Sequence, residues 1–419
     1  MLAADQFQQV EPGRMGQCPQ AARVGQFGAR RYRLQRRLRV IERHAAKHIF
    51  ELSTVKRRTP RALTPTAAGA YPDGRMDACG CFIAPPDLLA FVAEHGSAEQ
   101  RAAALRVAAG AAAYRSRRAA LAAAPPEGPT PADGRRTIYD AAHGQSLPGA
   151  PLRGEGDPPV SDTAANQAYD GSGDTFTFYR AAYGRDSVDG HGMGLVSSVH
   201  YGIAYDNAFW DGSQMVYGDG SGQIFQIGAL TAAVDVIGHE LTHGVTEYTA
   251  RLEYHTQPGA LNESFSDVFG SLVKQRLLGQ DAAAADWLIG AGTLVPSLGG
   301  ALRSMKAPGT AWQGDSQPAT MSGYRDLPDD GDPANDNGGV HLNSGIPNHA
   351  FYLAATAIGG YAWEKAGLVW YRTLTERLTP TADFRAAADA TVAVAADVYG
   401  AGAERDAVEG AWRAVGVLP

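Results

Sequence analysis

Two histidines four residues apart, with a glutamate directly after the first, are the clearest sign of chemistry in the chain. They stand in AAVDVIGHELTHGVTEYTA, residues 232–250. Residues four apart on an α-helix share one face with Cβ atoms about 5–6 Å apart, so His239 and His243 can reach one ion. Zinc takes imidazole nitrogen at about 2.0–2.1 Å and keeps a position for water when it has three protein ligands. Glu240 is close enough to act as a base on such a water, although an amphipathic helix with two surface histidines would show the same letters.

A carboxylate in the next segment, GALNESFSDVFGSLV, can supply the third ligand. We expect Gly259 to interrupt the chain and a second helix to begin near Leu261. Glu263 follows His243 by 20 residues and falls in the first turn of that helix, where it can reach the zinc. Asp267 lies one turn further on the same face. It can accept the free N–H of a zinc histidine, a partner that metal-bound histidines usually have.

The elements around these residues predict an α+β protein. The composition is globular, with 44% hydrophobic and 19% charged residues. Residues 137–228 contain short runs that we expect to be strands, TFTFYRAAY and GLVSSVHYG. Residues 229–419 have helical apolar spacing in FYLAATAI, AWEKAGLVWYRTLTERL, DFRAAADATVAVAADVYG and ERDAVEGAWRAVGV. The prediction is a strand-rich N-terminal domain followed by a mainly helical C-terminal domain.

A smaller unit, residues 76–136, precedes these two domains. Its segment CGCFIAPPDLL reads as an extended piece that ends at Pro85 and Pro86. Ser97 and Gln100 form a capping box at the start of an Ala-rich helix. The linker PPEGPTPADGRR, residues 125–136, ends in two arginines, and exposed seams of this kind are sensitive to proteases.

Residues 1–75 differ from the rest, with 15 Lys and Arg against 5 Asp and Glu. We expect this segment to be disordered or to reflect a misassigned start, with Met76 as the alternative first residue. A basic arm can bind nucleic acid, but ARRYRLQRRLRVIERH has no aromatic interleaving, so no nucleic-acid partner is expected. No apolar run of about 18 residues is present, so no membrane partner is expected either. The cysteines are Cys18, Cys79 and Cys81, so the main body cannot form a disulfide.

Five segments in one order resemble the thermolysin family of gluzincin peptidases. They are YDNAFWDGSQMVYGDG, HELTHGVTEYTA, GALNESFSDVFG, LRSM and DNGGVHLNSGIPNHAFY, and the match runs from about residue 137 to residue 419. The pattern His-Glu-x-x-His is a zinc metalloprotease signature, and thermolysin has a His₂Glu catalytic zinc site. The resemblance implies one zinc ion in the cleft between the two domains and hydrolysis of peptide bonds in proteins or peptides.

The resemblance also implies a role for each matching residue. His239, His243 and Glu263 would hold zinc, and Glu240 would be the general base. The other residues are Tyr254 and His341 as donors to the oxyanion, Asp336 as the partner of His341, Asn207 and Ala208 as binders of the substrate backbone, and Arg303 as the donor to a substrate carbonyl. An apolar pocket for the residue after the scissile bond would be lined by Leu230, Val236, Ile289 and Leu302.

Two other interpretations are a gluzincin aminopeptidase and a binding protein that has lost catalysis. Such aminopeptidases carry an acidic anchor for the substrate amine, commonly in a G-x-M-E-N motif, and the sequence has none. A non-catalytic relative should have lost Glu240, Tyr254 or His341, and all three are present. The sequence therefore favours a zinc endopeptidase that cuts before a bulky apolar residue.

The sequence departs from family members with long propeptides, which carry two calcium ions beside the zinc helices. Asp235 and Asp286 remain, but Lys274, Leu288 and Ala291 stand where the resemblance would place acids. Calcium needs six to eight oxygen ligands, several of them carboxylates. We therefore expect the double calcium site to be absent and leave open a single weak Ca²⁺ site elsewhere.

The front unit resembles the short pro-segment of protealysin-like members. We expect residues 76 to about 136 to cover the cleft as an intramolecular inhibitor and cleavage near Arg136 to release the enzyme. A thiolate of Cys79 or Cys81 could be a fourth zinc ligand in the zymogen, or both residues could simply pack near the Pro-Pro turn. Relatives with long propeptides are exported through signal sequences, so we expect secretion. A cytoplasmic location is the alternative, because no signal peptide is readable in this sequence. We expect a monomer.

Overall fold

The computed structural model describes residues 81–121, 135–330 and 332–419. The basic segment 1–75, Met76 and Cys79 lie outside the described residues, as does most of the 125–136 linker. All described residues fall in one compact unit, residues 71–419.

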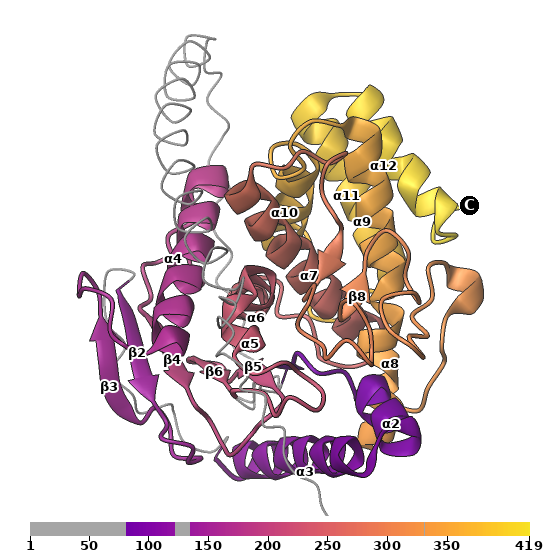
Figure 1. Cartoon of the computed structure of the whole chain (residues 1–419). Helices are drawn as coiled ribbons and strands as arrows, with labels where there is room; N and C mark the ends of the chain where they lie inside the picture. The colour runs from indigo at the N-terminus through magenta and orange to yellow at the C-terminus, as the bar shows by residue number, and fades with distance from the viewer. Residues whose placement is uncertain (1–80, 122–134, 331) are drawn as a thin grey trace, which may run out of the picture. The chain divides into compact units, whose positions relative to one another are not determined.

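A mixed β-sheet forms the N-terminal layer (Figure 1), with strands in the order β1-β5-β6-β4-β2-β3. The strands are β1 (Cys81–Phe82), β2 (Arg136–Asp140), β3 (Ala150–Gly154), β4 (Leu195–Val199), β5 (Ala208–Trp210) and β6 (Met215–Tyr217). Strands β2, β4 and β6 run parallel to one another, whereas β5 is antiparallel to β6. The pro-segment strand β1 pairs antiparallel with the outer side of β5. The expected strand in GLVSSVHYG is confirmed as β4.

The expected strand in TFTFYRAAY is wrong, because these residues belong to helix α4 (Thr163–Tyr183). The Asp162 side chain caps this helix by accepting a hydrogen bond from the backbone N–H of Ala165 at 2.9 Å. Gly184, with φ of 69°, ends it in the left-handed conformation. Thr, Phe and Tyr favour strands, but that preference depends on context and is overridden by the packing of α4 against β2 and β4.

The C-terminal half is helical, as predicted, which confirms the α+β fold. Its helices are α5 (Ala229–Ala232), α6 (Val234–Glu247), α7 (Thr256–Leu278), α8 (Asp336–Asn343), α9 (Gly345–Ile358), α10 (Ala366–Glu376), α11 (Phe384–Tyr399) and α12 (Ala403–Ala414). Two short strands, β7 (Leu288–Ile289) and β8 (Arg303–Ser304), pair separately. Helices α6 and α7 pack against each other more extensively than any other pair of elements.

Gly259 does not interrupt the chain, so this prediction is wrong, as is the start of the helix near Leu261. Helix α7 begins at Thr256 and continues through the glycine. A Cβ at Gly259 would lie 2.4 Å from Cγ1 of Val340, which means that the glycine is needed for close packing. Glu263 therefore lies in the second turn of α7 and not in the first.

The pro-segment contributes β1 and the helices α2 (Pro86–His95) and α3 (Ala98–Leu121). The capping box is confirmed, because Ser97 N–H donates to Gln100 Oε1 at 2.9 Å and Gln100 N–H donates to Ser97 Oγ at 3.2 Å. One face of the pro-segment helices is buried and belongs mostly to the main hydrophobic core; its members include Leu88, Leu89, Val92, Ala103, Ala104 and Val107. These helices are therefore packed as part of the folded unit.

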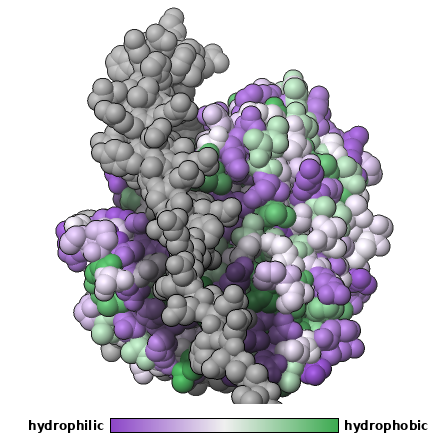
Figure 2. Space-filling view, viewed as in Figure 1, coloured by the Kyte–Doolittle hydropathy of each residue, from purple (hydrophilic) through white to green (hydrophobic). Residues whose placement is uncertain are grey.

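The surface of the described part is mixed in polarity. Figure 2 shows hydrophobic residues scattered among hydrophilic ones on the face that it presents. The large hydrophobic side chains that are exposed are Leu105, Ile203, Ile227, Tyr248, Leu278 and Tyr361. Among the described helices, none combines the length and the apolar character that crossing a membrane requires.

Candidate metal and catalytic site

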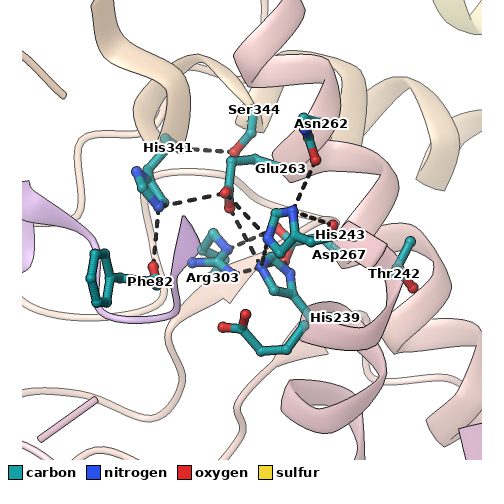
Figure 3. Close-up of polar contacts among 12 residues, drawn as sticks. Phe82, His239, Thr242, His243, Asn262, Glu263, Asp267, Arg303, His341 and Ser344 are labelled. Carbon is teal, nitrogen blue, oxygen red and sulfur yellow. Dashed lines mark hydrogen bonds and ion pairs between the residues drawn. The ribbon is translucent and has the colours of Figure 1, made fainter. Parts of the chain in front are cut away.

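The three expected zinc ligands meet between α6 and α7. The Nε2 atoms of His239 and His243 lie 3.1 Å apart, because four residues on α6 make one turn. Each Nε2 atom lies 3.5 Å from a carboxylate oxygen of Glu263 on α7. The three ligand atoms lie within 4.8 Å of one another, and all three side chains are buried. Figure 3 shows Glu263 pointing between the two histidines and His341.

The outer nitrogens of both histidines are held by α7. His239 Nδ1 donates to Asp267 Oδ1 at 2.7 Å, and His243 Nδ1 donates to Asn262 Oδ1 at 2.8 Å. A neutral imidazole with its proton on Nδ1 presents a lone pair on Nε2. The two lone pairs and the negatively charged carboxylate repel one another unless a cation lies between them. Two imidazoles and one carboxylate are the protein ligands of a known type of catalytic zinc site. The residues therefore fit zinc.

The charges at this cluster are strongly perturbed by burial. Burial lowers the pKa of His243 to about 4, so its imidazole is neutral, as a metal ligand must be. Burial alone would raise the pKa of Glu263, but the nearby His341, His243 and His239 lower it to about 2. The Oε2 atom of Glu263 is buried and has no hydrogen-bond partner among the described residues. An ionised, partly unpaired carboxylate is available to a cation at this position.

Glu240 lies on α6 and faces strand β5. Its Oε2 accepts a hydrogen bond from the backbone N–H of Trp210 at 3.0 Å. Its Oε1 is buried and has no hydrogen-bond partner among the described residues. Burial and the negative charge of Glu263 raise its pKa well above the usual range. A carboxylate so placed is a strong proton acceptor next to the metal cluster.

Tyr254 and His341 are 87 residues apart in sequence but meet at the site. The Tyr254 hydroxyl lies 3.2 Å from His341 Nε2 and also donates to Glu263. Asp336 accepts from His341 Nδ1 at 2.6 Å and from its backbone N–H at 2.7 Å. Burial would lower the pKa of His341, but Glu263 and Asp336 raise it to about 9. His341 is therefore a cationic donor at neutral pH.

The Arg303 guanidinium uses two of its three nitrogens to bind Asp267. Its Nε and one terminal nitrogen donate to the two oxygens of Asp267 at 2.7 and 2.8 Å. The remaining nitrogen is buried without a hydrogen-bond partner among the described residues, so it can donate to a ligand. Asn348 also donates to Asp267, at 2.8 Å. Sequence reasoning missed Asn348 and the Asn262 partner of His243, since neither amide stands out by type or spacing.

The pro-segment strand β1 pairs with β5 beside this site, and Figure 3 shows Phe82 next to His341. The Phe82 carbonyl oxygen lies 3.2 Å from His341 Nε2. Ile83 N–H donates to the Ala208 oxygen at 3.0 Å, and Ala84 N–H donates to Asn207 Oδ1 at 3.0 Å. The expected backbone binders, Asn207 and Ala208, thus hold an extended segment of the same chain.

The four expected pocket residues come from different elements and are all fully buried. Leu230 lies on α5, Val236 on α6, Ile289 on β7 and Leu302 directly before β8. Leu302 N–H donates to the Ile289 oxygen at 2.9 Å, which places these two residues side by side. All four belong to the same hydrophobic core cluster.

Lys274 occupies a position where the resemblance to calcium-binding relatives would place an acidic residue. Lys274 Nζ on α7 lies 2.9 Å from Asp235 and 2.9 Å from Asp286, and it donates to the Leu288 oxygen at 2.5 Å. Burial would lower the pKa of Lys274, but the two carboxylates raise it, so the ammonium group is charged. One positive charge therefore bridges two carboxylates beside α6 and α7.

Comparison with known proteins identifies the family. Residues 135–247 match the thermolysin metallopeptidase catalytic domain, and residues 250–417 match its alpha-helical domain. The chain is 50% identical to an extracellular metalloprotease of Pectobacterium carotovorum subsp. carotovorum over 67% of this chain and 81% of that protein. It is 46% identical to protease PrtS of Photorhabdus sp. (strain Az29) over 67% of this chain and 76% of that protein.

More distant relatives and a solved structure agree. The chain is 40% identical to thermolysin of Alicyclobacillus acidocaldarius subsp. acidocaldarius over 67% of its length, and it spans only 50% of that relative. A precursor of protealysin, a metalloproteinase from Serratia proteamaculans, superposes with a TM-score of 0.70 and 48% identity. That comparison covers 80% of this chain and 99% of the other. The chain belongs to the thermolysin metallopeptidase family and is a metalloprotease.

Proposed function

We propose that this metalloprotease is a zinc-dependent neutral endopeptidase with Glu240 as its general base, made as a zymogen. The observation that carries the proposal is the arrangement of Glu240, Tyr254 and His341 around the ligand cluster of α6 and α7. When bound, zinc would supply a Lewis acid that makes hydroxide available at neutral pH. His239, His243 and Glu263 would hold it.

The side chains then have complementary tasks. Glu240 takes the proton of the attacking water and passes it to the leaving amine nitrogen. The Tyr254 hydroxyl and His341 Nε2, which lie 3.2 Å apart, donate to the carbonyl oxygen of the scissile bond as it gains negative charge. Asp336 orients His341 by accepting from its Nδ1. Asn207, Ala208 and the free nitrogen of Arg303 bind the substrate backbone, and the pocket of Leu230, Val236, Ile289 and Leu302 receives a bulky apolar side chain after the scissile bond.

Casein hydrolysis with and without a zinc chelator tests this function. Glu240→Gln keeps the size of the side chain but removes the base, and we expect activity to fall by about 10²–10⁴-fold. Mass spectrometry of the fragments reports the preference after the scissile bond. Full activity in the chelated enzyme or in Glu240→Gln would refute the proposal, and cleavage before charged residues would refute the pocket assignment.

We infer that the pro-segment inhibits the enzyme by occupying the substrate strand. The contacts of Phe82, Ile83 and Ala84 with His341, Ala208 and Asn207 are those that a bound peptide would make. Gln100 adds a contact outside the cleft by donating to the Gln223 oxygen at 3.1 Å. If full-length protein and protein lacking residues 76–134 hydrolyse a peptide at equal rates from the first minute, the inhibition does not occur.

We propose that the activating cleavage near Arg136 occurs on the N-terminal side of Arg135 and not after Arg136. Arg136 starts β2, and its side chain ion-pairs with Glu155 and lies over the Tyr169 ring at 3.8 Å. The Arg135 oxygen accepts a hydrogen bond from Leu195 N–H at 2.9 Å, which ties this residue to β4. N-terminal sequencing of the active form tests this boundary.

We further propose one zinc per chain, no double calcium site, a monomeric protein and secretion. Lys274 supports the calcium proposal because its charge already bridges Asp235 and Asp286. Secretion rests on the related extracellular metalloprotease of Pectobacterium. Metal analysis, light scattering and assay of culture supernatant against cell lysate test these points. Activity confined to the lysate would favour the cytoplasmic alternative.

A further inference from the structure

Three residues on one face of helix α6 contact the same tryptophan, Trp210. Glu240, Gly244 and Glu247 are spaced i, i+4 and i+7 on α6, so they line one face of the helix. All three contact Trp210, the last residue of β5. The backbone N–H of Trp210 donates to Glu240 Oε2 at 3.0 Å, and its indole Nε1–H donates to Glu247 Oε2 at 3.0 Å.

The indole fits closely between these residues. Trp210 is only 1% exposed. A Cβ at Gly244 would lie 3.2 Å from the indole Cζ2 and 3.4 Å from the Cβ of Val188, so even an alanine would press on the ring and require it to shift by a few tenths of an ångström. The absence of a side chain at Gly244 therefore allows the close approach of β5 to α6. The hydrogen bond from the indole N–H to Glu247 fixes the orientation of the ring.

Trp210 provides the only hydrogen bond to the Glu240 carboxylate among the described residues. The position of that backbone N–H depends on β5, whose Trp210 pairs with Met215 on one side and with Cys81 of the pro-segment on the other. Once the pro-segment is gone, β5 has lost one of its two neighbours. The indole anchor then carries more of the task of holding β5 against α6.

We propose that Glu247 is a positioning residue for catalysis: by anchoring the Trp210 indole it fixes the backbone N–H that orients Glu240. This inference rests on the proposed role of Glu240. Glu247 does not reach the reacting atoms itself. Misplacement of a catalytic group by about 1 Å can cost about 10²-fold in rate. Loss of the anchor therefore lowers kcat by about 10-fold or more, while the proposed pocket of Leu230, Val236, Ile289 and Leu302 keeps its residues.

The test compares three variants of the activated protein, each expressed as the full-length chain and then freed of its pro-segment, at equal zinc content. Glu247→Leu removes the acceptor, whereas Glu247→Gln keeps an oxygen that can accept from the indole. We expect Glu247→Leu to lower kcat at least 10-fold with KM changed less than about 2-fold, and Glu247→Gln to restore kcat to within about 2-fold. Glu376→Leu on α10 is the control, since this exposed glutamate forms its ion pair with Arg372 on its own helix and with no other residue of the described chain.

A second pair of variants covers the case in which Glu247→Leu fails to fold. Gly244→Ala crowds the indole without touching Glu247, and Trp210→Phe removes the indole N–H but keeps the backbone donor. Both should lower kcat, and Trp210→Phe combined with Glu247→Leu should be no worse than the more impaired single variant. The proposal is overturned if Glu247→Leu keeps its kcat, if Glu247→Gln is equally impaired, or if the effect lies wholly in KM.

These outcomes separate the inference from the proposed function. If Glu240→Gln is inactive while Glu247→Leu and Gly244→Ala behave like the wild type, only the positioning role fails. If Glu240→Gln retains activity, the general-base assignment fails, and the positioning role fails with it.

Discussion

Replacing Lys274 should destabilise the protein and create a response to calcium. The Lys274 side chain is 10% exposed, and its Nζ lies 2.9 Å from Asp235, whose side chain is only 3% exposed. Removing one partner of a buried ion pair typically costs about 3–5 kcal/mol, because the other charge stays buried and unpaired. Asp235 keeps hydrogen bonds from the backbone N–H groups of Val236 and Gly290. We therefore expect Lys274→Met to cost about 3 kcal/mol, at the lower end of that range.

Thermal unfolding in the Glu240→Gln background, which avoids autolysis, provides the assay. For the compact unit 71–419, with an unfolding entropy of about 2.1 cal/mol/K per residue, a loss of about 3 kcal/mol corresponds to a fall in Tm of about 4 °C. Lys365→Met is the matched control, because Lys365 is 48% exposed and also forms an ion pair, with Glu404 at 2.7 Å. An exposed pair of this kind contributes about 0–1 kcal/mol, so its Tm should barely change.

Calcium distinguishes this interpretation from simple loss of packing. Lys274→Glu places a third carboxylate beside Asp235 and Asp286, so it should be unstable alone and regain stability with added Ca²⁺. At a calcium concentration of 100 times Kd the gain is about 2.7 kcal/mol. The wild type should show no such gain. The reasoning is refuted if Lys274→Met melts like the wild type, or if calcium stabilises the wild type as much as Lys274→Glu.

Three further predictions concern other parts of the molecule. His341→Phe should lower kcat by about 10²–10³-fold with zinc still bound, because one oxyanion donor is lost; steady-state kinetics measures this. Phe91→Ala should shorten the latency of the full-length protein, because the Phe91 ring lies 5.5 Å from Trp312 and fills the space above Gly314. His200→Asn should destabilise the protein at pH 6 more than at pH 10, as read from melting temperatures.

The His200 prediction follows from its two carboxylate partners. His200 Nδ1 lies 2.7 Å from Asp219 and Nε2 lies 2.7 Å from Asp162, and only an imidazolium donates from both nitrogens. Burial would lower the pKa of His200, but these carboxylates raise it above 6.5. The stabilisation is therefore complete below pH 6.5 and is lost as the pH rises through the folded-state pKa. An equal effect of His200→Asn at both pH values would contradict this account.

The other two predictions have equally direct contrary outcomes. Wild-type kcat in His341→Phe would show that this histidine does not act on the carbonyl oxygen. Unchanged latency in Phe91→Ala would show that the pro-segment is held by β1 and α3 without α2. Leu105→Ala on α3 is the control for latency, because this side chain is 63% exposed.

The amino-acid sequence alone determined the features that depend on short spacing. His239 and His243 share a face of α6 because one helical turn separates them, and Ser97 with Gln100 marks the start of α3. The order of strand-rich and helical segments gave the α+β class, since apolar periodicity reports which face of each element is buried. The five motifs indicated the family, because each motif is a short run of neighbouring residues and can be recognised without knowing the fold.

Tertiary structure alone decided which distant residues meet. Tyr254 and His341 come together only because α8 packs on α7, a contact that leaves no trace in local periodicity. Local propensity also failed where packing competed with it: α4 formed from residues that favour strands, and α7 continued through Gly259 because Val340 needs that space. The same holds for Asn262, whose role arises from a distance of 2.8 Å to His243 and not from its type. Long-range packing sets such distances, and short stretches of sequence do not encode them.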